Sequence, residues 1–111
     1  MPEILKGKSI VVVGGTSGLG LSAVRALERE GAMVTALGLG ATNARDLPTS
    51  VVLIEGDAVL ETTTANAIEE MVKRCGRLDG LYHVAGGSGR KFGDGPLHDL
   101  TLDAWHKTLD L

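Results

Sequence analysis

Features that define several other classes of protein are missing from this sequence. Its one cysteine, Cys75, cannot form an internal disulfide, so nothing points to an oxidising compartment. The net charge is −3, and because no basic run is present we expect no nucleic-acid partner. No apolar stretch has the length of a membrane span, and the first residues lack the apolar run of a signal peptide. These absences predict a cytoplasmic chain without a membrane partner.

What the composition does contain is typical of one soluble domain. A chain of 111 residues is long enough for one compact core but not for two. Hydrophobic residues make up 43% and charged residues 23%, as in ordinary globular proteins. The 16 glycines gather at a few places, which is expected where the backbone turns sharply or approaches a ligand. The three histidines show no metal-ligand spacing, so we expect no metal site.

Strands and helices are predicted to alternate along the chain. The apolar run at 9–13, rich in β-branched residues, and the run at 51–54 predict strands buried on both faces, and 33–37 and 80–85 are predicted to be strands as well. Apolar residues at helical spacing predict two amphipathic helices, and Thr101 is the expected N-cap of a third. This alternation predicts right-handed crossovers and a parallel sheet. We expect strands at 9–13, 33–37, 51–54 and 80–85, helices at 18–30, 63–75 and from 102 onward, and an apolar face of the second helix formed by Ile68, Met71, Val72 and Cys75.

A glycine-rich loop, V-G-G-T-S-G-L-G, follows the first predicted strand and opens the first predicted helix. In such a loop Gly14 permits the tight turn, Gly18 permits close approach of a pyrophosphate, and Gly20 permits close packing of helix and strand. The helix N-terminus favours an anion, and Thr16 and Ser17 add hydroxyl donors. The alternative is a glycine-rich turn without a ligand, which the strand–loop–helix setting disfavours.

The spacing G-x-x-x-G-x-G resembles the short-chain dehydrogenase/reductase family, whose cofactor loop reads T-G-x-x-x-G-[IL]-G. Asp57 and Ala58, after the third strand, are similar to the family's acidic position that meets the adenine ring. The run L-Y-H-V-A-G ends at Gly86 and stands in the place of the family's N-N-A-G motif, which lines the cofactor. The segment from Pro96 to Trp105 looks like the beginning of the family's long crossover helix. The resemblance extends from residue 5 to residue 111.

The resemblance implies an α/β fold, a Rossmann-type doubly wound parallel sheet that is truncated after the fourth strand and the start of the next helix. Residues 1–111 would then be an incomplete NAD(P)-binding half-domain. The implied partner is a dinucleotide, and the implied reaction of the full-length protein is hydride transfer between nicotinamide and a carbonyl or alcohol substrate. The implied cofactor-binding residues are Gly14, Thr16, Ser17, Gly18, Leu19, Gly20, Gly38, Asp57, Ala58, Ala85, Gly86 and Gly87.

The sequence departs from the family pattern at two motifs. Val13 replaces the threonine of the loop and removes a hydroxyl that steadies it. His83 and Val84 replace the two asparagines of N-N-A-G, which removes hydrogen bonds between neighbouring strands, although His83 could replace one of them. Ala85 and Gly86 can still pack against the cofactor.

The choice between NAD and NADP depends on the end of the second strand. The family's acidic position, which accepts hydrogen bonds from the ribose hydroxyls of NAD, corresponds to Gly38. Leu39 follows, so the arginine that accompanies NADP is also absent. We expect NAD or NADP, with NADP slightly favoured because Gly38 leaves room for a phosphate. Side chains that could reach this phosphate are Thr42, Asn43 and Arg45.

No catalytic residue is expected in these 111 residues. The serine, tyrosine, lysine and asparagine of the family would lie beyond Leu111, and Tyr82 is on a strand rather than in a Tyr-x-x-x-Lys helix. We therefore expect the fragment alone to be inactive. The fourth strand would be an unpaired edge, and Trp105 and Leu109 would form an exposed apolar face. These surfaces predict a homo-oligomer or a piece of a longer protein.

Two other functions remain open at this point. The first is a non-catalytic nucleotide-binding or assembly module, since a sensor needs the same loop as an enzyme. The second is a structural, flavodoxin-like domain with an empty loop.

Overall fold

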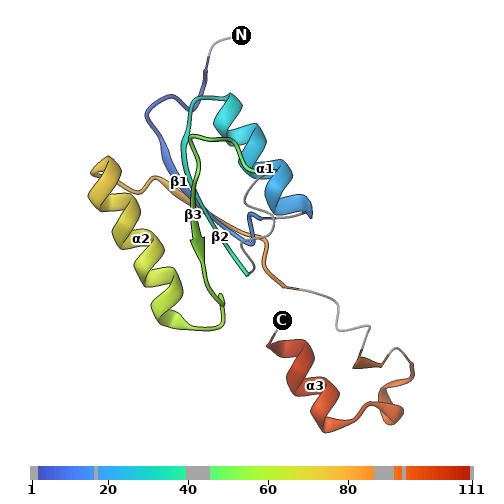
Figure 1. Cartoon of the computed structure of the whole chain (residues 1–111). Coiled ribbons are helices and arrows are strands. Elements are labelled where there is room, and N and C mark those ends of the chain that lie inside the picture. Colours follow the sequence, from blue (N-terminus) through green and yellow to red (C-terminus); the bar gives the residue numbers. More distant parts are fainter. Residues whose placement is uncertain (1–2, 17, 40–45, 87–91, 94, 111) are drawn as a thin grey trace.

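In the computed structural model, four short strands form one parallel sheet with helices on both faces (Figure 1). The structure describes residues 3–16, 18–39, 46–86, 92–93 and 95–110. Within these ranges, no helix combines the length and the apolar character needed to cross a membrane. The elements are β1 (Ser9–Val13), α1 (Gly18–Arg29), β2 (Met33–Gly38), β3 (Val52–Glu55), α2 (Glu61–Cys75), β4 (Gly80–His83), the 3-10 helix η3 (Leu97–Asp99) and α3 (Leu102–Leu109).

The strand order β3-β2-β1-β4 confirms the predicted Rossmann-type arrangement. β1 lies in the centre and pairs in parallel with β2 on one side and β4 on the other. Val13, the last residue of β1, is in register with Leu37 of β2 and His83 of β4. The chain winds outward from β1 through β2 to β3 and then crosses back to β4 on the other side of β1, so the carboxyl end of β1 lies at the switch point where α/β sheets bind ligands.

α1 covers one face of the sheet, and α2 covers the other (Figure 1). On the α1 side, Val24 of the helix is fully buried against Val12 and Ala36 of the strands. On the α2 side, Ala67 and Met71 are fully buried. Both helices therefore pack by an apolar stripe, as their sequence periodicity predicts. The α2-side core of buried residues consists of Val11, Val13, Leu37, Ala67 and Met71.

Some sequence-based details need correction. Val72, assigned to the apolar face of α2, is 44% exposed, because that face is centred on Ala67 and Met71 one position away. β4 ends at His83, since the amides of Val84 and Ala85 both donate to the carbonyl oxygen of Val13 and turn the chain off the strand. β3 is shifted by one residue, and α2 begins two residues earlier than predicted.

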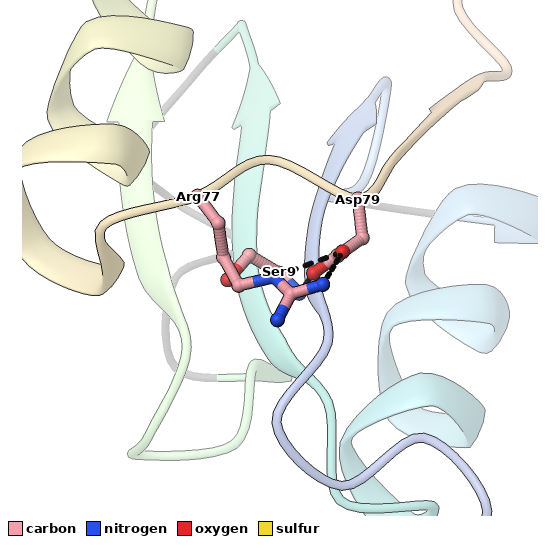
Figure 2. A network of polar contacts seen from close by, with 3 residues as sticks. All are labelled: Ser9, Arg77 and Asp79. Atoms are coloured by element: carbon pink, nitrogen blue, oxygen red, sulfur yellow. Dashed lines mark hydrogen bonds and ion pairs between the residues drawn. The ribbon is translucent and has the colours of Figure 1, made fainter.

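An aspartate ties β1 to β4 at the end of the sheet opposite the glycine loop (Figure 2). Asp79 Oδ2 accepts the amide of Ser9 at 2.7 Å, and the Asp79 amide donates to the Ser9 carbonyl at 2.8 Å. Arg77 donates to Asp79 Oδ1 through Nε at 3.0 Å. The Arg77 guanidinium, followed by the Ser9 amide, lowers the pKa of Asp79 below its usual value of 3.8. The ionised carboxylate therefore stabilises the start of both strands.

α3 lies beyond the carboxyl edge of the sheet, with its C-terminal end toward the strands (Figure 1). Thr101 is its N-cap, as predicted, and its hydroxyl accepts the amide of Ala104 at 3.0 Å. The radius of gyration is 16.1 Å, whereas a compact chain of this length would have about 13 Å. The difference reflects the position of α3, whose apolar residues Trp105 and Leu109 are largely exposed.

Candidate functional site

The glycine loop is hydrogen-bonded to β2 on one side of β1 and lies against the segment after β4 on the other. The amides of Gly14 and Gly15 donate to the carbonyl oxygen of Leu37, at 2.7 and 3.1 Å. Gly14 has a φ of +87°, and a Cβ on it would lie 2.7 Å from the amide nitrogen of Ala85. This position therefore requires glycine both for its left-handed backbone and for the close approach of the chain after β4.

The start of α1 is held equally close to the end of β1. A Cβ on Gly20 would overlap the carbonyl oxygen of Gly14, so only glycine allows the helix to begin this near the strand. Gly20 is buried, whereas Gly18 and Leu19 of the same turn are exposed. The first amides of α1 have no partner within the helix and carry its positive end, so this turn can hold an anion.

A cavity of about 850 Å³ opens at the carboxyl ends of the strands, over the α2 side of the loop. Its size is within the range of small-molecule and cofactor sites. It joins parts of the chain that are far apart in sequence: the glycine loop, the ends of β2 and β3, the segment after β4 and the end of α3. The residues that line it are Gly14, Thr16, Leu37, Gly38, Leu39, Gly56, Asp57, Ala58, Val59, His83, Ala85, Gly86, Leu109 and Asp110.

Asp57 lies where β3 leads into α2. Its Oδ1 accepts the amide of Val59 at 3.0 Å, which orders the turn before the helix. The amide of Gly56 donates to the carbonyl oxygen of Gly38 at 2.9 Å, so this turn is joined to the end of β2. Asp57 thus presents a carboxylate at the rim of the cavity, at the other side of β2 from the glycine loop.

The end of β2 offers no charged group to a ligand. Gly38 lines the cavity without a side chain, and Leu39 beside it is 67% exposed. A buried Thr16 lies against Gly38 from the glycine loop. Thr42, Asn43 and Arg45, which the sequence offered as contacts for a phosphate, lie outside the described residues.

The segment after β4 closes the cavity on the side opposite β3. His83, Ala85 and Gly86 all line it, although His83 stands where the family has an asparagine. Val84 points away and packs in the core on the α1 side, which explains why an apolar residue is accommodated there. His83 is exposed and faces the cavity, so it adds a hydrogen-bonding group at a position where sequence reasoning expected only a strand contact.

The structure brings together most, but not all, of the residues that the sequence singled out. Leu19 is 79% exposed and does not line the cavity. Gly18 lines a separate cavity of about 500 Å³ on the outer side of α1. Ser17 and Gly87 lie outside the described residues. The predicted residues that do line the larger cavity are Gly14, Thr16, Gly38, Asp57, Ala58, Ala85 and Gly86.

Other cavity residues were not predicted. Val59 directly follows Asp57 and Ala58, so its neighbours were a usable signal. Leu109 and Asp110 line the cavity only because the end of α3 turns back toward the strands, which no local pattern indicates. Across the described residues, no three histidine, cysteine, aspartate or glutamate side chains are grouped so that they could hold a metal ion.

A parallel sheet in this order, with a glycine loop between the central strand and a helix N-terminus, defines an α/β protein with a Rossmann-type fold. The family model described as short chain dehydrogenase matches residues 8–111, and the chain belongs to this family.

Similar curated proteins and solved structures agree with this assignment. The chain is 31% identical to "Short-chain dehydrogenase reductase 4" of Arabidopsis thaliana over 96% of its own length and 37% of the relative. It is 35% identical to "(21S)-21-acetoxyl-apo-melianone synthase SDR" of Melia azedarach, over 86% of the chain and 38% of the relative. The chain thus spans less than half the length of these relatives.

Among solved structures, a short-chain type dehydrogenase/reductase from Mycobacterium ulcerans superposes with a TM-score of 0.84 at 29% identity, over 96% of this chain and 41% of that one. A short chain dehydrogenase from Burkholderia cenocepacia, solved in complex with NADP, superposes with a TM-score of 0.79 at 29% identity, over 96% and 45%.

Proposed function

We propose that the cavity at the carboxyl edge of the sheet is a dinucleotide site, and that the chain is the cofactor-binding part of an NAD(P)-dependent oxidoreductase of the short-chain type. The observation that carries this proposal is the convergence of Gly14, Asp57 and Ala85 on one cavity. Gly14 and Gly20 let the glycine loop, the start of α1 and the segment after β4 pack against one another, and this packing brings the N-terminus of α1 to the carboxyl end of β1, where a pyrophosphate would bind.

Each part of the site has a proposed role. The first turn of α1 and the hydroxyls of Thr16 and Ser17 hold the phosphates. The Asp57 turn receives the adenine ring, and the segment from Ala85 to Gly87 packs against the nicotinamide side. The proposed cofactor-binding residues are Gly14, Thr16, Ser17, Gly18, Leu19, Gly20, Gly38, Asp57, Ala58, Ala85, Gly86 and Gly87.

When bound, a nicotinamide dinucleotide supplies or accepts the hydride in the reaction of a carbonyl or alcohol substrate. The residues of this chain bind and orient it, and its described residues do not include the tyrosine and lysine pair that the family uses to transfer the proton. Tyr82, the one tyrosine, is in β4, and the residue four positions later is Gly86 rather than lysine. We infer that residues 1–111 are an incomplete domain and that the chain alone binds a dinucleotide without turnover.

The cofactor is NAD or NADP, with NADP slightly favoured. Gly38 presents no carboxylate that would repel a 2′-phosphate. The structural relative from Burkholderia cenocepacia in complex with NADP supports this preference by analogy. The assembly of the chain is proposed to be oligomeric, because the β4 edge and the apolar residues of α3 are exposed.

The test is a titration of the 111-residue chain with NADH and NADPH, in which binding is monitored by nicotinamide fluorescence. We expect saturable binding by the unmodified chain. Gly18→Asp should weaken it by about fivefold or more, because a carboxylate within a few Å of a phosphate costs roughly 1 kcal/mol or more.

Gly7→Asp is the matched control for this charge. Gly7 and Gly18 both have positive φ, at +81° and +54°, and a Cβ on either would have no heavy atom within 4 Å. Gly7 precedes β1 at the opposite end of the sheet, so this variant should bind like the unmodified chain. A folded chain that shows no saturable binding, or equal losses in both variants, would contradict the proposal.

A further inference from the structure

At the end of β2, the Thr16 side chain of the glycine loop fills the space that a side chain on Gly38 would need. An ideal Cβ on Gly38 would lie 2.5 Å from Thr16 Oγ1, 2.7 Å from its Cγ2 and 3.2 Å from its Cβ. Carbon atoms in normal contact are about 3.5–4.0 Å apart, so any side chain at position 38 would overlap Thr16. The φ of Gly38 is not among the positive values, so its backbone would accept other residues and only the space is missing.

Thr16 cannot move away from this position as a unit. The two residues before it, Gly14 and Gly15, are held to Leu37 by their amide hydrogen bonds, one residue from Gly38. Thr16 itself is only 5% exposed, so surrounding protein restricts its side chain as well. Relief of the overlap would have to come from rotation about the Cα–Cβ bond.

Rotation does not provide that relief. The three staggered positions on the Thr16 Cβ hold two heavy atoms, Oγ1 and Cγ2, and one hydrogen. Both positions now filled by heavy atoms are too close to a Cβ at residue 38. Rotation about the Cα–Cβ bond can move one heavy atom to the position now held by the hydrogen. The other heavy atom then still occupies one of the two positions that are too close to residue 38. Threonine or valine at position 16 therefore excludes a side chain at 38. Alanine removes the two closest atoms and leaves only its own Cβ, at 3.2 Å, so a side chain at 38 needs a shift of a few tenths of an ångström.

We propose that Thr16 determines the cofactor selectivity of this chain by excluding a carboxylate from position 38. This inference rests on the proposed dinucleotide site and names the residue pair that governs ribose recognition within it. An acidic side chain at the end of the second strand would accept hydrogen bonds from the ribose hydroxyls of NAD and repel the 2′-phosphate of NADP. With Thr16 in place, position 38 carries no carboxylate, and the space beside Gly38 stays open to a phosphate.

The packing step is tested by thermal unfolding of Gly38→Ala in three backgrounds: unmodified, T16V and T16A. We expect the added methyl to lower the melting temperature by about 4 °C or more when residue 16 is threonine or valine. In the T16A background it should lower the melting temperature much less. Each comparison subtracts the effect of the residue 16 change itself. Equal losses in all three backgrounds would overturn the steric match.

The selectivity step is tested by the ratio of the Kd values for NADH and NADPH. Gly38→Asp alone should lose thermal stability and gain no preference for NADH. The double variant T16A/G38D should recover stability and shift the ratio toward NADH by about tenfold or more relative to T16A alone. If G38D alone gives that shift at full stability, Thr16 does not exclude the carboxylate and the inference is wrong. If the unmodified chain binds neither nucleotide, the proposed function fails instead.

Discussion

The contact between the glycine loop and the segment after β4 predicts how two glycine substitutions will differ in cost. Gly14 and Gly7 both have left-handed backbones, with φ of +87° and +81°. An alanine in this conformation costs about 1–2 kcal/mol wherever it is placed. At Gly7 a Cβ meets nothing within 4 Å, so this should be the whole cost of Gly7→Ala.

At Gly14 the same Cβ would lie 2.7 Å from the Ala85 amide nitrogen and 3.0 Å from its Cα. These are backbone atoms, so they cannot turn aside as a flexible side chain would. Overpacking of this kind typically adds about 1–3 kcal/mol. We therefore expect Gly14→Ala to destabilise the chain by about 2–5 kcal/mol in total, a substantial part of the stability of a small domain.

Urea denaturation monitored by circular dichroism gives the free energy of unfolding of both variants under one set of conditions. We expect Gly14→Ala to lose at least about 1 kcal/mol more than Gly7→Ala, because only Gly14 approaches the chain after β4. Equal losses in the two variants would show that the loop and β4 are not held together as described, and the geometry of the site would have to be revised.

Three further predictions concern the framework around the site. Met71→Ala should cost about 2–5 kcal/mol because its side chain is fully buried. Val72→Ala, at a position that is 44% exposed, should change the stability by no more than about 0.5 kcal/mol, and urea denaturation distinguishes the two. The pKa of Asp79 is lower in the folded chain than in the unfolded chain. Its stabilising contribution is therefore present above the unfolded pKa and is lost as the pH falls through the lower folded pKa. The melting temperature of Asp79→Asn should consequently depend less on pH in the acidic range than that of the unmodified chain. Thr101→Ala removes the cap of α3 and should weaken that helix by about 1 kcal/mol, which amide hydrogen exchange in α3 would detect without a comparable change in the sheet.

Local patterns were sufficient to predict the framework. The apolar run of β1, the glycine loop after it and the stripe of α1 lie within 21 consecutive residues, so their joint meaning is visible in the sequence. The Thr101 cap was predicted for the same reason, since it depends on a side chain and an amide three residues apart. Short-range chemistry and periodicity carry this information directly.

The details that were wrong depend on contacts between distant segments. Met71 and Val72 are neighbours in sequence and equally apolar, and only packing against the sheet decides that Met71 is buried. The end of β4 is set by hydrogen bonds to Val13, about 70 residues earlier, rather than by the residues of the strand.

The same limit applies to the candidate site. Gly38 was recognised as the ribose position, but its match to Thr16 requires the position of the loop relative to β2. The contribution of Leu109 and Asp110 to the cavity depends on how the chain returns from β4 to the strands, for which the sequence offers no periodic signal.

The most direct test of the central claim is to map NADP⁺ onto the ¹⁵N-labelled chain by NMR. We predict saturable chemical-shift changes concentrated at Gly14 and Thr16 of the glycine loop, at Gly38, at Asp57 to Val59 and at Ala85 and Gly86. The amides of β1 near Ser9, at the far end of the sheet, should remain unchanged. Absence of saturable changes in the folded chain, or changes confined to the outer side of α1 around Arg25, would contradict a dinucleotide site at the carboxyl edge of the sheet.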